Sequence, residues 1–179
     1  MKKFLNFNTL FGIFLIFGAA LARLLPHPAN FTPIAAIALF GGRQFSKKIS
    51  LIIPILALFA SDAIIGFYSI KIMLAVYLSF TTTVLLGWQL RKNFSISKMI
   101  GLGIISSIVF FLITNAAVWA FSGMYSVNFS GLVLSYWYGL PFFRNELMGT
   151  IFYATIIFVC QEIINLITLR TRDSNQSQV

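Results

Sequence analysis

Long apolar runs, separated by short polar or charged segments, make up almost the whole chain. The runs lie near residues 4–22, 31–43, 49–68, 70–90, 99–122 and 146–169. A helix that crosses a bilayer needs about 20 apolar residues, and five of the six runs supply them. The pattern therefore predicts an all-α fold: a bundle of six transmembrane helices forming a single domain over residues 1–179, with residues 170–179 as a short polar tail in the cytoplasm.

The run at 31–43 is shorter than the others. At a rise of 1.5 Å per residue it reaches about 20 Å, against a hydrocarbon core of about 30 Å. Three arrangements accommodate such a helix: the bilayer thins around it, it stands with little tilt, or it packs inside the bundle where its ends meet protein. The sequence leaves these alternatives open.

The connection from about Ser122 to Asn145 is the longest part outside the predicted spans. Within it, the segment Leu132–Phe143 mixes Trp137 and two tyrosines with aliphatic residues. Tryptophan and tyrosine are enriched where the membrane meets water. We therefore expect an interfacial helix or a cap on the outer face.

Composition supports an integral membrane protein and argues against a soluble domain and a nucleic-acid-binding protein. Hydrophobic residues make up 59% of the chain and charged residues only 9%, whereas soluble domains carry about 25% charged residues. The net charge of +9 comes from residues at the ends of the apolar runs. This distribution is typical of the positive-inside rule and not of a nucleic-acid-binding surface.

The basic residues predict the orientation. Six spans place ten of them on one side and three on the other, which favours both termini in the cytoplasm. The ten are Lys2, Lys3, Arg43, Lys47, Lys48, Arg91, Lys92, Lys98, Arg170 and Arg172, and the three are Arg23, Lys71 and Arg144. The preference is modest, because an outside N-terminus with a re-entrant second segment still gives nine against four.

The N-terminal segment also resembles a secretory signal. Lys2 and Lys3 precede an apolar stretch that ends in Ala20-Leu21-Ala22, as at a signal cleavage site. Cleavage there would leave five spans starting at Arg23. We favour the uncleaved helix, because the apolar run is long for a signal and the charge asymmetry is larger when it is retained.

Polar residues from distant parts of the chain are expected at one level in the outer half of the membrane. The loop from Arg23 to Pro33 holds the single histidine and three of the five prolines. Polar groups inside a bilayer face a cavity or a partner by default. Their convergence predicts an outward-facing pocket for a small molecule. The candidate substrate-binding residues are Arg23, His27, Asn30, Asp62, Asn115, Trp119, Arg144 and Asn145.

A structural interpretation competes with this one. Asp62 could form an ion pair with Arg23 or Arg144, and Asn115 could join helices through hydrogen bonds. Taken singly, each of these residues fits the structural role better. Glu162 lies near the inner end of the last run, where we expect it to extend to the surface or to pair with a cytoplasmic base.

Small residues spaced four apart predict close contacts between helices. Such pairs allow two backbones to approach, and most should serve packing inside the bundle. They are Gly18 with Ala22, Ala38 with Gly42, Ala57 with Ser61, and Gly103 with Ser107.

Sequence motifs for chemistry are few. The sequence holds no HExxH zinc motif, no GxSxG nucleophile turn and no Walker-type phosphate loop. His27 has no second ligand at metal-binding spacing. We therefore predict a protein that is not an enzyme and has no metal or cofactor. Its partners would be the lipid bilayer and a small-molecule ligand, with no nucleic acid. The function we predict is that of a membrane subunit that captures a vitamin-like or other small solute for transport. A structural or assembly subunit without a ligand is the alternative.

Several motifs carry a resemblance over nearly the whole chain. They are Pro26-His-Pro-Ala-Asn-Phe-Thr-Pro-Ile34, Leu39-Phe-Gly-Gly42, Ser61-Asp62, Thr114-Asn115 with Val118-Trp119, and Pro141-Phe-Phe-Arg-Asn145. They resemble an uncharacterised family of bacterial multi-pass membrane proteins. That resemblance implies a bacterial inner-membrane protein.

In layout the chain is also similar to the substrate-binding S components of energy-coupling factor (ECF) transporters. This similarity implies six helices, an outward substrate pocket and cytoplasmic termini. It also implies transport that depends on a membrane T component and ATPases. S components carry an Ala-xxx-Ala pair in the first helix, which contacts the T component. The chain departs from that pattern, because its nearest match, Gly18-xxx-Ala22, lies toward the outer end of the first helix.

Overall fold

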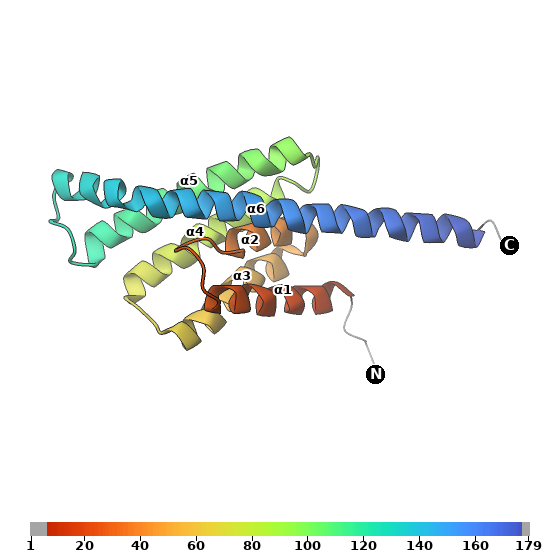
Figure 1. Cartoon of the computed structure of the whole chain (residues 1–179), viewed down its shortest axis with the longest axis horizontal. Helices are drawn as coiled ribbons and strands as arrows, with labels where there is room; N and C mark the ends of the chain where they lie inside the picture. The colour runs from red at the N-terminus through yellow and green to blue at the C-terminus, as the bar shows by residue number, and fades with distance from the viewer. Residues whose placement is uncertain (1–6, 177–179) are drawn as a thin grey trace.

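The computed structural model describes the backbone of residues 7–176 and the side chains of residues 14–164. The described chain is all-helical, as predicted (Figure 1). Its helices are α1 (Phe7–Leu24), α2 (Ile34–Gln44), α3 (Lys47–Ile65), α4 (Ile70–Trp88), α5 (Ile96–Phe121) and α6 (Phe129–Gln176).

Four stretches of the described helices are long and apolar enough to cross a membrane. They are Lys47–Ile65, Ile70–Trp88, Ile96–Phe121 and Phe129–Ile164. Each also presents large apolar side chains on the outside of the bundle, for example Ile52 at 51% and Leu74 at 60% exposure. Such a surface is favourable in hydrocarbon and unfavourable in water. The length and the apolar surface of these helices are those of a membrane protein.

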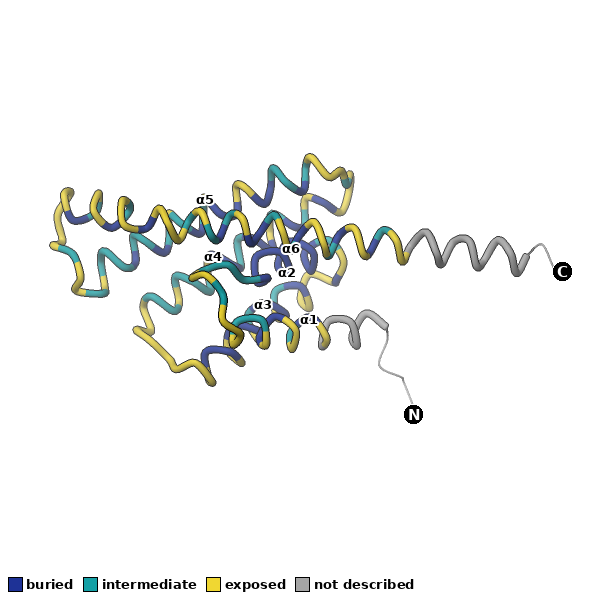
Figure 2. Tube along the Cα trace, viewed as in Figure 1, coloured by how far each residue is buried: buried dark blue, intermediate teal, exposed yellow. Residues whose placement is uncertain are grey.

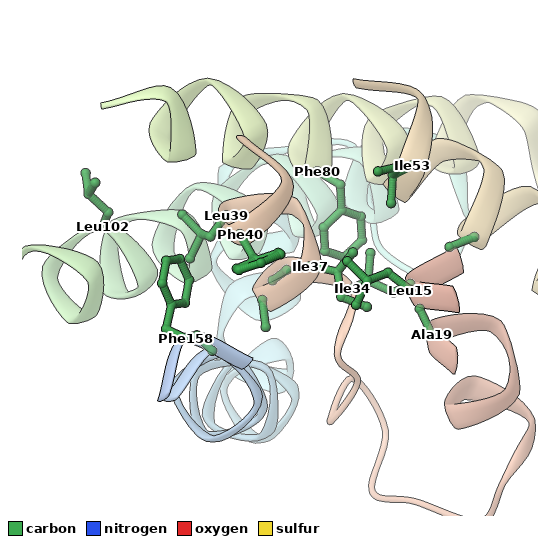
Figure 3. Packing of buried hydrophobic residues seen from close by; sticks show 14 of the residues in the cluster. Leu15, Ala19, Ile34, Ile37, Leu39, Phe40, Ile53, Phe80, Leu102 and Phe158 are labelled. Carbon is green, nitrogen blue, oxygen red and sulfur yellow. The ribbon is translucent and has the colours of Figure 1, made fainter. Parts of the chain in front are cut away.

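The short helix α2 forms the centre of the bundle. Every residue from Ile34 to Gly42 is buried, and α2 contacts each of the other described helices (Figure 2). Around it, Leu15 of α1, Phe80 of α4 and Phe158 of α6 belong to the same apolar core (Figure 3). Of the arrangements open to a helix of this length, the chain adopts packing inside the bundle, where other helices cover it.

Two glycines allow α2 and α4 to touch along their backbones. A Cβ atom on Gly42 would lie 2.5 Å from the carbonyl oxygen of Val84, and one on Gly87 would lie 2.4 Å from that of Leu39. Neither position has room for a side chain. Packing at Gly42 agrees with the small-residue prediction, whereas Gly18 of α1 has no such neighbour within 4 Å.

Helix α6 differs from the expectation. The connection expected from about Ser122 to Asn145 is shorter than predicted, because α6 is continuous from Phe129 to Gln176, so that the segment Leu132–Phe143 with Pro141 belongs to this helix. Its first part packs along α5, where Tyr136 donates a hydrogen bond to the Leu112 carbonyl oxygen at 3.0 Å. The segment after residue 169, expected as a polar tail, also begins as helix. At 48 residues, α6 is about 72 Å long.

Basic residues and their partners define one end of the bundle. Arg43 donates to Oε1 of Glu162 from two nitrogens, each at 3.1 Å, and its guanidinium lies 3.8 Å from the Phe94 ring centre. Arg91 donates to the backbone carbonyls of Gly42 and Phe45, each at 2.6 Å. The prediction that Glu162 pairs with a base at this end is confirmed.

Candidate functional site

An ion pair and a hydrogen bond connect three helices at the other end of the bundle. Nη2 of Arg23, at the end of α1, lies 2.9 Å from Oδ1 of Asp62 in α3. Asp62 is 1% exposed, and its Oδ2 accepts a hydrogen bond from the Tyr77 hydroxyl of α4 at 2.9 Å. Arg23 also donates to the Ser61 hydroxyl and to the Leu58 carbonyl. Both charges are therefore compensated within the protein.

The loop between α1 and α2 is fixed by polar contacts to its neighbours. The ring nitrogens of His27 lie 2.8 Å from the Pro28 carbonyl oxygen and 3.3 Å from that of Arg23. Asn145 of α6 donates from Nδ2 to the Ala29 carbonyl oxygen at 3.1 Å. Asn30 has a φ of +65°, a left-handed conformation that asparagine tolerates better than most residues. The loop is thus shaped around Asn30 and attached to α6.

Two adjoining cavities lie under and beside this loop. The loop cavity has a volume of about 450 Å³ and is lined by Arg23, His27, Asn30, Thr32, Ile34, Leu58, Ile65, Tyr68, Val76, Phe80, Phe110 and Glu146. The hairpin cavity has a volume of about 630 Å³ and is lined by Asn30, Ile72, Val76, Phe110, Thr114, Asn115, Val118, Met124, Tyr125, Ser135, Tyr138, Gly139 and Phe142. Asn30, Val76 and Phe110 line both. Mostly apolar walls with a few polar groups are typical of small-molecule sites.

Asn115 of α5 lines the hairpin cavity and contacts α6. Its Nδ2 donates to the Phe111 carbonyl oxygen at 2.9 Å, and its backbone carbonyl oxygen accepts from the Ser135 hydroxyl at 2.9 Å. A Cβ atom on Gly139 would lie only 2.3 Å from Oδ1 of Asn115. Gly139 therefore leaves the space that the amide occupies.

The predicted site residues divide into three groups. Arg23, His27 and Asn30 line the loop cavity, and Asn115 lines the hairpin cavity. Asp62 and Asn145 line neither: Asp62 pairs with Arg23, which lines the loop cavity, and Asn145 holds Ala29, the residue before Asn30. Trp119 and Arg144 line neither as well: the Trp119 indole donates to the Ser126 carbonyl oxygen at 3.1 Å, and Arg144 is exposed.

Glu146 lines the loop cavity and was missed by the sequence prediction. It is 4% exposed, and both of its carboxylate oxygens accept from the Thr150 hydroxyl, at 3.1 and 3.2 Å. Our predicted span began at residue 146, which placed this residue at a helix end. The sequence did hold a signal for Glu146: the chain has only four acidic residues, so each one that falls in an apolar run is a candidate for a functional role.

Tyr68, in the connection between α3 and α4, adds a hydroxyl to the loop cavity. Burial raises the pKa of Tyr68 to about 12, the negative charge of Asp62 adds to the rise, and Arg23 opposes it. The phenol therefore stays protonated at neutral pH and can donate a hydrogen bond.

The side chains that could bind a metal or act as acid-base catalysts are separated or already have partners in the described part of the chain. No three His, Cys, Asp or Glu side chains gather there in a way that could hold a metal ion. Asp62 is held by Arg23 and Tyr77, and the ring nitrogens of His27 face carbonyl oxygens. What this arrangement offers is binding: apolar walls, hydroxyl and amide groups, and one buried carboxylate.

Comparison with known proteins gives a family and no function. No curated protein and no solved structure matches the chain. A family profile, described as a family of unknown function (DUF6580), matches residues 3–171. The chain therefore belongs to this family of unknown function.

Proposed function

We propose that this protein is a membrane-embedded subunit that binds a small solute in the two adjoining cavities and presents it for transport. The observation that carries the proposal is the pair of cavities, of about 450 and 630 Å³, that share Asn30, Val76 and Phe110. Sites for small organic molecules commonly have volumes of about 300–1,000 Å³. Transport would depend on partners that hydrolyse ATP, because this sequence holds no phosphate-binding loop.

The distribution of charge supports an outward-facing site. The loop cavity lies at the end of the bundle opposite Arg43 and Arg91, which belong to the larger basic group in the sequence. By the positive-inside rule that basic group is cytoplasmic. Six spans with both termini in the cytoplasm, in a bacterial inner membrane, complete the proposal. The ECF-like partners, a T component and ATPases, rest on layout alone.

Ligand binding is tested with the purified protein in mild detergent. The protein is incubated with a metabolite extract and measured by native mass spectrometry, beside a Val76→Trp variant that fills the space between the cavities. Val159→Trp is the matched control, because Val159 is 45% exposed on the outside of α6. A bound mass that disappears in Val76→Trp and persists in Val159→Trp is the expected result. A folded protein that binds no component of the extract overturns the proposal.

The alternative, a structural or assembly subunit without a ligand, has its own support. Arg23, Asp62 and Tyr77 satisfy one another, as a network that fixes helix positions would. That alternative predicts an empty, stable protein that copurifies with another membrane subunit. It also predicts that Val76→Trp leaves this association intact.

A further inference from the structure

The loop cavity contains one acidic side chain that has no basic partner among the described residues. Arg23 and Asp62 form an ion pair, so their charges cancel. Glu146, which also lines this cavity, accepts a hydrogen bond from the Thr150 hydroxyl. Among the described residues no basic side chain forms an ion pair with it, since the ion pairs found there are Arg23 with Asp62 and Arg43 with Glu162.

A second group near Glu146 is also unsatisfied. Ser107 of α5 is fully buried, its side chain faces Glu146, and its hydroxyl has no hydrogen-bond partner in the described part of the chain. Ser107 lies two helical turns deeper along α5 than Asn115, which is about 12 Å. Unpaired buried polar groups are rare in native proteins and call for an explanation.

A carboxylate inside a membrane protein is costly unless it has a partner, and such residues commonly mark ligand or ion pathways. The cavity joins Glu146 to the loop residues His27 and Asn30. A ligand that enters beneath the loop can therefore reach the carboxylate. Phe80 and Phe110, whose ring centres are 5.0 Å apart, line the same cavity. Their faces suit the apolar body of an organic molecule and attract a cation.

We propose that the loop cavity binds an organic cation, with its protonated nitrogen against Glu146 and its apolar body against Phe80 and Phe110. This inference rests on the proposed function, because it names the ligand class of the same site. An ammonium group donates up to three hydrogen bonds, which fits the two acceptor oxygens of a carboxylate. An anionic ligand would meet uncompensated negative charge at the same position.

Three compounds with one apolar body test the charge preference: 2-phenylethylammonium, 2-phenylethanol and phenylacetate. Their binding to the purified full-length protein is measured by isothermal titration calorimetry in detergent. We expect the ammonium compound to bind at least tenfold more tightly than the other two. Equal or tighter binding of the alcohol or the carboxylate overturns the inference, and so does a folded protein that does not bind the ammonium.

Three variants test whether Glu146 is responsible for the preference. Glu146→Gln keeps the shape of the side chain and removes its charge, so the tenfold preference should disappear. Glu162→Gln is the matched control on the same helix, at the opposite end of the bundle, and should keep it. Glu146→Asp retains the charge and should preserve the preference if Glu146→Gln does not fold. An unchanged preference in Glu146→Gln, or a lost one in Glu146→Asp, contradicts the assignment.

The test of the cation preference can fail without the test of the proposed function failing. If a metabolite binds and Val76→Trp abolishes it while Glu146→Gln leaves the ammonium preference unchanged, capture stands and the cation inference fails. If the folded protein binds neither a metabolite nor the ammonium compound, both fail.

Discussion

The Arg23–Asp62 ion pair is a residue-scale contact whose loss we expect to be costly. The Arg23 side chain is 18% exposed and that of Asp62 is 2% exposed, so water does little to replace a missing partner. Asp62→Asn should lower the free energy of unfolding by roughly 3–5 kcal/mol. Denaturant unfolding in detergent measures this loss.

The second ion pair supplies the control for that experiment. The side chain of Glu162 is 44% exposed in its pair with Arg43, so Glu162→Gln should change stability by about 1 kcal/mol or less. Replacing both members of the first ion pair, with Arg23→Met and Asp62→Asn, should recover part of the stability that Asp62→Asn alone removes. A cost for Asp62→Asn no larger than that of Glu162→Gln would contradict the prediction.

Gly139 provides a prediction about the hairpin cavity. Because a Cβ atom would lie 2.3 Å from Oδ1 of Asn115, Gly139→Ala must displace that amide from the Phe111 carbonyl. Overpacking of this kind destabilises by about 1–3 kcal/mol. Gly101→Ala is the control, since a Cβ there has no neighbour within 4 Å. Thermal unfolding should show a lower melting temperature only for Gly139→Ala, and equal values would rule out the clash.

Asn145 holds the loop over the cavity, and its removal should loosen that loop. One hydrogen bond contributes about 1 kcal/mol, which corresponds to roughly fivefold faster exchange. Hydrogen-deuterium exchange of residues 28–32 should therefore accelerate by that factor in Asn145→Ala. Arg144→Ala, at the exposed neighbouring residue, should leave the exchange unchanged. Similar exchange in both variants would mean that this hydrogen bond does not restrain the loop.

At the scale of elements, α2 and α4 are in backbone contact. Gly42→Ala would place a methyl group 2.5 Å from a carbonyl oxygen of α4, and a backbone cannot move aside as a flexible side chain does. We expect a large drop in melting temperature or failure to fold. The adjacent Gly41→Ala is the control, because its Cβ would make an ordinary contact at 3.6 Å with Phe45.

Size-exclusion chromatography followed by thermal unfolding distinguishes the two alanine variants. A Gly42→Ala protein as stable as Gly41→Ala would show that the helices separate at little cost. The comparison is sharp because both glycines lie in α2, both are buried, and the substitution is the same.

Helix boundaries also explain which parts of the site could be predicted. Glu146 is deep in α6 because that helix begins at Phe129. From the sequence, the aromatic segment Leu132–Phe143 is expected to lie outside the last span, which is predicted to begin at residue 146. The first part of α6 instead packs on α5 through Ser135 and Tyr136. That packing provides the stabilisation that local propensity does not.

At the scale of the whole molecule, orientation is the prediction to test. In a Cys160→Ser background, Val127→Cys lies in the exposed α5–α6 connection and Lys92→Cys in the exposed α4–α5 connection. With the basic end in the cytoplasm, an impermeant maleimide should label Val127→Cys in intact spheroplasts. Lys92→Cys should be labelled only after the membrane is opened. The reverse pattern would invert the topology.

The sequence by itself determined the helical class and the apolar surface of the long helices. These follow from composition and from local periodicity, which depend on near neighbours in the chain. The tertiary structure decided that α2 is the central helix, that Asp62 pairs with Arg23 and not with Arg144, and that Glu146 faces a cavity. Such facts depend on which distant segments pack together, and hydrophobicity in a bilayer is too uniform to specify those partners.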